Sequence, residues 1–175
     1  MKNSIVLIGM PGSGKSTVGK SLSERLKLKF TDTDILISSA YGKTPGDIVK
    51  EHGREFFLNM QEEIILGMDT ANQVIATGGS VIMSEAVMKH LGNNGIIVFI
   101  KLGYDPMVRR LAPDRRLARG SGQSLMEMYD ERLPLYEKYA DIIVDCGNRC
   151  VTEITEEIID KTKNNFNSHS SNAVQ

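Results

Sequence analysis

The fold of this chain is decided near its N-terminus, by the stretch Gly9-Met10-Pro11-Gly12-Ser13-Gly14-Lys15-Ser16-Thr17. The stretch matches G-x-x-x-x-G-K-[ST], the pattern of a phosphate-binding loop. A short, mostly apolar run, residues 4–8, predicts a buried strand directly before it. After it, Val18, Leu22 and Leu26 recur at helical spacing among polar residues. Strand, glycine-rich loop and helix form the context that this motif requires, so we expect the protein to bind ATP or GTP.

Each part of the loop has a predicted role. The glycines let successive backbone N–H groups point at phosphate oxygens, aided by the positive end of the following helix. Lys15 would reach the outer phosphates, and the Ser16 hydroxyl would hold Mg²⁺. The residues expected to bind the nucleotide are Gly12, Ser13, Gly14, Lys15, Ser16 and Thr17.

Length and composition restrict the class of protein. The 175 residues suffice for one α/β domain, and a net charge of -1 gives no positive field that would favour nucleic acid or an anionic membrane. No apolar run is long enough to span a membrane and no signal peptide precedes the first strand, so we expect a cytoplasmic protein. We also expect a monomer, although no motif in the sequence bears on the oligomeric state. Cys146 and Cys150 lack the second ligand pair of a zinc site and are predicted to be free thiols.

Predicted strands alternate with predicted helices along the chain. The strands are expected at 4–8, 29–31, 74–76, 96–100 and 141–145. The helices are expected at 35–41, from Thr44-Pro45 onward, at 54–68, at 84–91 with a turn at 92–95, at 105–111, at 125–139 with a break near Pro134, and at 151–163. This alternation predicts a doubly wound parallel sheet with helices on both faces. A kinase domain would cover residues 1–163, and the polar residues 164–175 are predicted to form a disordered tail.

Acidic and glycine-rich stretches follow two of these strands. Asp32 and Asp34 lie in a predicted loop, where an extended backbone would place both carboxylates on the same side. One carboxylate could hold a Mg²⁺-bound water while the other accepts a proton from a substrate hydroxyl. In 77–80, Gly78 and Gly79 would let a small ligand approach the backbone closely. Because ligands of such sheets bind at the carboxyl ends of the strands, we expect both stretches to converge with the phosphate loop.

Arginines mark two further stretches. The segment 112–123 is basic, contains glycine and has little apolar periodicity, and its Arg116 and Arg119 are candidate cations for the γ-phosphate. A charge run of this kind is also compatible with a solvated surface, but in a phosphate-binding protein it favours a mobile lid. Arg132 precedes Leu133-Pro134-Leu135-Tyr136 and is a candidate ligand for a substrate carboxylate.

Taken together, these motifs resemble the shikimate kinase family, a branch of the nucleoside monophosphate kinase fold. The resemblance rests on the phosphate loop, on D-T-D at 32–34, on T-G-G at 77–79 and on R-x-P-L-Y at 132–136, in that order. It implies a five-stranded sheet, a lid over ATP, and Mg²⁺ ligated through water by Asp32. It further implies that Asp34, Gly78 and Gly79 engage the substrate hydroxyls and that Arg132 binds the substrate carboxylate.

The chain departs from the family pattern at three places. Ser80 stands where the family has the last glycine of a triplet, and the lid arginine of the family would lie near Leu117, so that Arg116 or Arg119 must substitute for it. The family signature G-x-x-x-F-R carries a second carboxylate-binding arginine, and here Leu58 occupies that position. Arg54 lies one helical turn earlier and is the candidate replacement.

The predicted function is ATP-dependent phosphorylation of a hydroxyl on a small carboxylated polyol. The first candidate is conversion of shikimate to shikimate 3-phosphate in aromatic amino-acid biosynthesis. Leu58 and Ser80 leave open a related kinase with another hydroxy-acid or polyol acceptor, such as gluconate. A non-catalytic nucleotide-binding regulatory protein is a third possibility. The intact catalytic set argues against it: Lys15, Ser16, Asp32 and Asp34.

Overall fold

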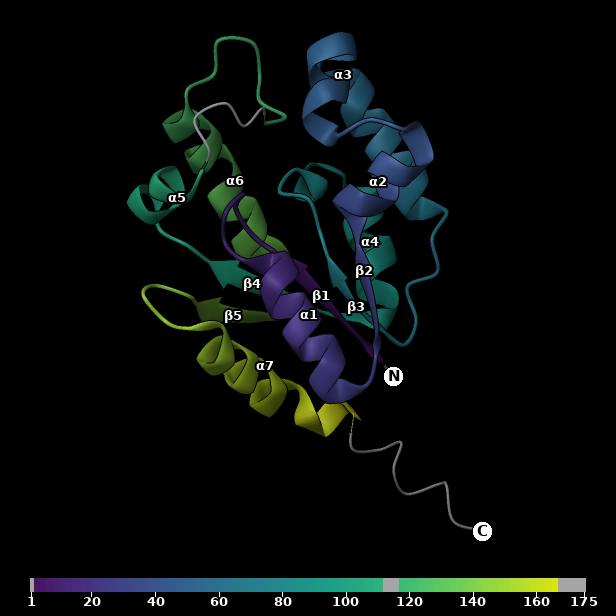
Figure 1. Cartoon of the computed structure of the whole chain (residues 1–175), viewed down its shortest axis with the longest axis vertical. Coiled ribbons are helices and arrows are strands. Elements are labelled where there is room, and N and C mark those ends of the chain that lie inside the picture. Colours follow the sequence, from purple (N-terminus) through teal and green to yellow (C-terminus); the bar gives the residue numbers. More distant parts are fainter. Residues whose placement is uncertain (1, 112–116, 167–175) are drawn as a thin grey trace.

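Five parallel strands form the centre of the protein, in the order β2-β3-β1-β4-β5 (Figure 1). The computed structural model describes residues 2–111 and 117–166. The strands are β1 (Ser4–Ile8), β2 (Lys29–Asp32), β3 (Gln73–Ala76), β4 (Gly95–Lys101) and β5 (Ile142–Asp145). The order places β1 between β3 and β4, so the chain that leaves β1 emerges where the strand order reverses, the usual ligand site of such sheets.

Helices cover both faces of this sheet, as the alternating pattern predicts. The helices are α1 (Lys15–Leu26), α2 (Thr33–Tyr41), α3 (Pro45–Leu66), α4 (Glu85–Asn94), α5 (Tyr104–Arg110), α6 (Leu125–Tyr139) and α7 (Val151–Phe166), with a 3₁₀ turn η1 (Val81–Met83). In Figure 1, α1 and α7 lie on one face, and α4 and α6 lie on the other. The predicted doubly wound fold with five parallel strands is therefore confirmed.

The main core follows from the apolar strands. All residues of β1 are buried, and the pairings Ile5 to Ile96 and Leu7 to Val98 hold β1 against β4. A strand covered on both faces buries every side chain, which is why these strands are mostly apolar along their length rather than alternating. The result is a rigid platform whose carboxyl edge carries the loops of interest.

A second, smaller hydrophobic cluster lies outside the sheet, between α2 and α3. Its buried members are Ile37, Ile48, Phe57 and Ala118, and Leu58 packs against them. Helix α3 begins as predicted, with the Thr44 side chain accepting from the Asp47 backbone N–H and with proline at the first helical position. The helix is interrupted at Gly53, whose φ of 85° separates two helical limbs, in keeping with the two helices expected in this region.

Several local predictions were wrong. Helix α6 runs unbroken through Pro134. Pro134 lies on the exposed face, so it costs the helix only one backbone hydrogen bond, and the buried Arg132 and Tyr136 on either side of it hold the helix in place. The turn expected at 92–95 is the last turn of α4, and β4 begins at Gly95. Helix α7 continues through Phe166, into the segment predicted to be a disordered tail; residues 167–175 lie outside the described residues.

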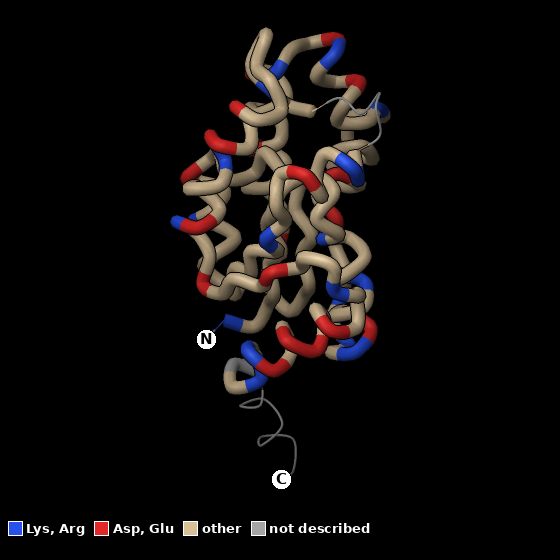
Figure 2. Tube along the Cα trace, turned by 90° about the vertical axis from the view of Figure 1, so that its left-hand side faces the viewer, with Lys and Arg blue, Asp and Glu red and all other residues tan. Residues whose placement is uncertain are grey.

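Charges of both signs are interspersed along the trace, in agreement with a net charge of -1 (Figure 2). In the described part of the chain, no helix is both long and apolar enough to cross a membrane. Cys146 is buried and Cys150 is exposed, and both are free thiols, as expected. The predicted lid of 112–123 is described only from residue 117 onward, so Arg116 lies outside the described residues.

Candidate active site

The phosphate loop joins β1 to α1 in a conformation that only glycine adopts easily. Gly14 occupies the N-cap position of α1 with a φ of 88°, in the left-handed region. Glycine supplies no capping side chain, and the first turn of α1 contains no acidic residue. The N–H groups at the start of the helix are therefore directed toward a cavity of about 230 Å³ that Lys15, Ser16 and Thr17 also line.

Lys15 lies folded against the loop that it follows. Its Nζ donates to the carbonyl oxygens of Gly9 and Met10, at 2.8 and 2.9 Å, and to Oγ of Ser13 at 3.3 Å. The residue is 8% exposed, so its charge lies in a partly dehydrated setting at the edge of the cavity. A phosphate oxygen that reached this ammonium would gain more from it than from a solvated lysine.

Asp32 and Asp34 are positioned by a helix rather than by an extended loop, which corrects the expectation for this segment. Strand β2 ends at Asp32 and α2 begins at Thr33, because the Asp32 carboxylate caps the helix by accepting from the backbone N–H of Asp34 at 3.0 Å. The two aspartates thus do not share one side of a strand. Both nevertheless line the cavity of the phosphate loop.

The residues beside the loop suit a magnesium ion. Oδ2 of Asp32 accepts a hydrogen bond of 2.5 Å from the Ser16 hydroxyl, so a carboxylate and a hydroxyl oxygen already meet at the cavity. Such oxygens are the ligands that Mg²⁺ prefers, and this ion commonly takes only one or two protein ligands and completes its shell with phosphate and water. The described residues contain no cluster of three or more metal-binding side chains, and a site of this kind does not need one.

Asp34 packs directly over Gly78, in the turn that follows β3. A Cβ atom at position 78 would lie 2.5 Å from Oδ1 of Asp34, so any larger residue there would push the carboxylate out of its present position. The backbone N–H of Gly78 donates to the hydroxyl of Thr33 at 2.9 Å, which fixes the turn against the start of α2. The expected convergence of 32–34 with 77–80 is therefore present in the structure.

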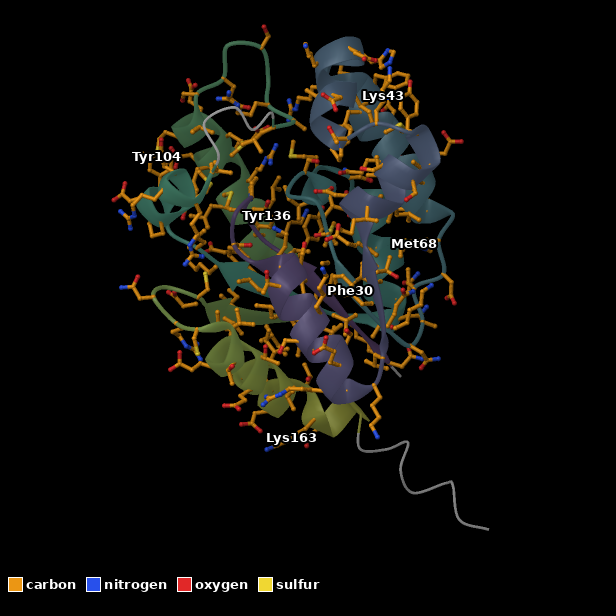
Figure 3. All side chains as sticks on the ribbon, in the orientation of Figure 1. Phe30, Lys43, Met68, Tyr104, Tyr136 and Lys163 are labelled. Carbon is orange, nitrogen blue, oxygen red and sulfur yellow. The ribbon has the colours of Figure 1, made fainter. Side chains whose placement is uncertain are left out.

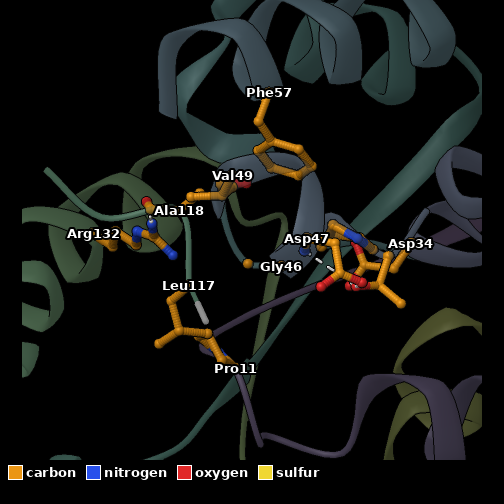
Figure 4. A pocket seen from close by; sticks show the side chains of 14 residues that line it. Pro11, Asp34, Gly46, Asp47, Val49, Phe57, Leu117, Ala118 and Arg132 are labelled. Carbon is orange, nitrogen blue, oxygen red and sulfur yellow. Dashed lines mark hydrogen bonds between the residues drawn. The ribbon is translucent and has the colours of Figure 1, made fainter. Parts of the chain in front are cut away.

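A larger cavity of about 530 Å³ adjoins the phosphate loop (Figure 4). Asp34 and Arg132 lie on its two sides, Phe57 lies at the top of the view, and Leu117 and Pro11 lie at the bottom. Its wall also contains Gly78, Gly79 and Ser80. Pro11, Asp34 and Gly79 line both this cavity and that of the phosphate loop, so the two spaces share a wall.

Arg132 is a buried cation without an ion-pair partner among the described residues. The residue is 1% exposed, its Nη2 donates to the carbonyl oxygen of Ala118, and its Nε has no hydrogen-bond partner. Burial lowers the pKa of the guanidinium, while Tyr136 and Glu131 oppose this shift. A buried charge with an unused donor at a cavity wall is suited to an anionic ligand, and a carboxylate matches the guanidinium geometry.

The other predicted arginines lie elsewhere. Arg54 is absent from the cavity wall, and its Nη2 pairs with Oε1 of Glu131 at 3.3 Å. Arg119 donates from Nη1 to the carbonyl oxygen of Gln123 at 2.7 Å. Leu58 is turned into the small cluster between α2 and α3 and likewise does not line the cavity.

Three residues of the site were not predicted from the sequence. Thr33 holds Gly78, Gln61 accepts a hydrogen bond of 3.0 Å from the Ser80 hydroxyl, and Tyr136 donates to the carbonyl oxygen of Gly79. In Figure 3, Tyr136 lies near the middle of the molecule, far from Lys163 on the periphery. Thr33 and Tyr136 carried a local signal, their places in D-T-D and R-x-P-L-Y, whereas Gln61 carried none.

Comparison with known proteins identifies the family of the chain. Residues 11–163 match the family model of shikimate kinase. The chain belongs to the shikimate kinase family. A shikimate kinase of Caldanaerobacter subterraneus is 34% identical over 164 residues, which cover 91% of this chain and 95% of the relative. One from Clostridium botulinum is 37% identical over 163 residues, 90% of this chain and 96% of the relative.

The fold agrees with this membership. The shikimate kinase from Acinetobacter baumannii, solved in complex with shikimate, superposes with a TM-score of 0.83 at 25% identity, covering 94% of this chain and 95% of that one. As a member of the shikimate kinase family, the protein is a phosphotransferase that acts on a small molecule, with ATP as the phosphoryl donor. The family resemblance inferred from the ordered motifs is thus confirmed.

Proposed function

We propose that this protein transfers the γ-phosphoryl group of MgATP to a hydroxyl of shikimate and releases ADP and shikimate 3-phosphate, a step of aromatic amino-acid biosynthesis. One observation carries the proposal. Asp34 lies in the wall shared by the phosphate-loop cavity and by the cavity that contains Arg132. A carboxylated polyol with its carboxylate at Arg132 would thus direct a hydroxyl toward Asp34 and the phosphates.

The phosphate loop would supply the nucleotide site. Backbone N–H groups of 12–17 bind the phosphate oxygens, and Lys15 offsets the negative charge on the outer phosphates. Ser16 and Asp32 hold Mg²⁺, which neutralises part of the phosphate charge when bound. The bond from the γ-phosphorus to the leaving oxygen of ADP breaks as the bond to the acceptor oxygen forms.

Asp34 would act as the proton acceptor. As the acceptor hydroxyl oxygen bonds to phosphorus, its proton passes to the Asp34 carboxylate, so the transfer leaves ADP, a phosphate ester and a protonated Asp34. Gly78, Gly79 and Ser80 form the adjoining wall, where the backbone and the Ser80 hydroxyl bind the remaining acceptor hydroxyls. A cation from 112–123, either Arg116 or Arg119, is proposed to stabilise the transferring group.

The acceptor carboxylate would depend mainly on one arginine. Arg132 lies at the cavity, whereas Arg54 is engaged with Glu131 and Leu58 packs away from the cavity. One charge-assisted contact fewer weakens binding by about 1.5–3 kcal/mol, or roughly ten- to hundredfold. We therefore expect a high KM for shikimate.

A panel of acceptors tests the proposal. ADP release is measured with shikimate, gluconate and nucleoside monophosphates, and the product is identified by phosphorus NMR. The proposal requires shikimate to have the highest kcat/KM and the product to be the 3-phosphate. A higher kcat/KM for gluconate or another polyol would show that this compound, and not shikimate, is the acceptor. Nucleotide binding without turnover of any acceptor would favour a regulatory role. A monomeric, cytoplasmic protein without nucleic-acid or membrane partners remains our prediction.

A further inference from the structure

The carboxylate of Glu131, on α6, bridges two parts of the molecule that are distant in sequence. Its Oε1 pairs with Nη2 of Arg54, on α3, at 3.3 Å, and its Oε2 accepts a hydrogen bond of 2.7 Å from Nε2 of Gln123. The bond from Gln123, and also the charge of Arg54, hold the pKa of Glu131 below its usual range. The ionised carboxylate thus connects α3 with the segment that precedes α6.

Gln123 in turn organises that segment, residues 117–123, which we call the wall segment. The side-chain oxygen of Gln123 accepts a hydrogen bond of 2.9 Å from the backbone N–H of Gly120. The backbone N–H of Gln123 donates to the Gly120 carbonyl oxygen at 3.1 Å. The Gln123 carbonyl accepts from Arg119 at 2.7 Å. A closed turn results, and the side chain of Glu131 fastens Gln123, the last residue of this turn, to α6.

The wall segment supplies one side of the acceptor cavity. Leu117 and Ala118 line that cavity, and Ala118 is also buried among Ile37 and Phe57 in the cluster between α2 and α3. The carbonyl oxygen of Ala118 accepts the hydrogen bond from Arg132. Consecutive residues of α6, Glu131 and Arg132, therefore hold the two ends of the wall segment.

We propose that Glu131 is a positioning residue for the acceptor site, and that Arg54 acts through Glu131 rather than by binding the acceptor. The pair holds the wall segment in place, and with it the carbonyl that orients Arg132. The inference rests on the proposed function, because its kinetic readout requires an acceptor that binds to Arg132.

Two consequences separate this role from a general effect on folding. Loss of the pair should raise the KM for shikimate about tenfold, which is the effect of one charge-assisted hydrogen bond. The KM for ATP should stay within about twofold, because the phosphate loop is held by β1 and α1. Since Arg54 and Glu131 share one contact, the variants Arg54→Gln and Glu131→Gln should not be additive.

The experiment compares Arg54→Gln, Glu131→Gln and the double variant with the matched control Glu137→Gln. Glu137 lies on the same helix and pairs with Lys101 at 3.0 Å, at similar exposure, but does not line the cavity. Each protein is assayed for both KM values, and amide hydrogen exchange is followed in 117–124 without ligands. We expect faster exchange there and a raised KM for shikimate in all three test variants, with neither change in the control.

Three results would overturn the inference. If Arg54→Gln raises the KM for shikimate and Glu131→Gln does not, Arg54 binds the acceptor directly. If the two single effects add in the double variant, the residues act independently. If exchange in 117–124 is unchanged in Glu131→Gln, the wall segment is held by other contacts. Exchange is measured without an acceptor, so failure of shikimate as the substrate of the wild-type protein would be recognised separately.

Discussion

The hydroxyl of Ser16 donates to Oδ2 of Asp32 across 2.5 Å, which joins the first turn of α1 to the N-cap of α2. The same Asp32 carboxylate accepts the backbone N–H of Asp34 through its other oxygen. One residue thus combines a structural role, capping α2, with the proposed role of holding Mg²⁺. These roles are separable, because asparagine caps helices as well as aspartate but lacks the negative charge.

Asp32→Asn should therefore leave stability almost unchanged and weaken the response to magnesium. We expect the Mg²⁺ concentration for half-maximal activity to rise about tenfold, since a neutral oxygen replaces a carboxylate near the ion. The measurement is a Mg²⁺ titration of the initial rate, with thermal unfolding as the control. An unchanged titration curve would remove Asp32 from the proposed metal site.

Lys15→Ala tests the phosphate loop. We expect kcat to fall by about 10²-fold or more, because the ammonium offsets charge that grows on the phosphates in the transition state. Little apolar area is lost, so thermal unfolding should change little. Steady-state kinetics at saturating ATP are the measurement, and a kcat close to wild type would show that this loop is not the catalytic site.

Leu58→Arg tests the departure from the family pattern. If shikimate is the acceptor, an arginine whose longer side chain leaves the cluster and reaches the cavity should lower the KM for shikimate by about tenfold through a further charge-assisted contact. Leu58 packs in the small cluster between α2 and α3, so the variant should also unfold at a lower temperature. Unchanged or undetectable turnover of shikimate, with efficient phosphorylation of another hydroxy compound, would argue against shikimate while leaving the kinase assignment intact.

Arg116→Ala and Arg119→Ala address the basic segment. Loss of a cation that contacts the transferring group should lower kcat more than it raises the KM for ATP, because the contact strengthens in the transition state. Arg119 also donates to the Gln123 carbonyl, so its replacement should in addition raise the KM for shikimate. Equal losses for every arginine in 109–119 would indicate a diffuse electrostatic effect and contradict the assignment of one catalytic arginine.

The sequence by itself determined the features that depend on neighbouring residues. The phosphate loop, the buried strands and the caps at Thr44 and Ser84 are encoded in short stretches, because backbone conformation, strand burial and capping act over a few residues. The order of strands and helices followed from the same local patterns. Pro134 shows their limit, since packing on both sides keeps α6 continuous where a local rule predicts a break.

Only the tertiary structure decided which side chains meet in the site. Gly78 with Thr33, Gly79 with Tyr136 and Arg54 with Glu131 are pairs separated by 45, 57 and 77 positions. No local pattern specifies such pairs, because each depends on how the helices pack against the sheet and on which strands are neighbours. Arg54 and Leu58 illustrate the point. The family signature placed position 58 near the acceptor and Arg54 one helical turn earlier, but packing turned Arg54 toward Glu131 and Leu58 into an apolar cluster.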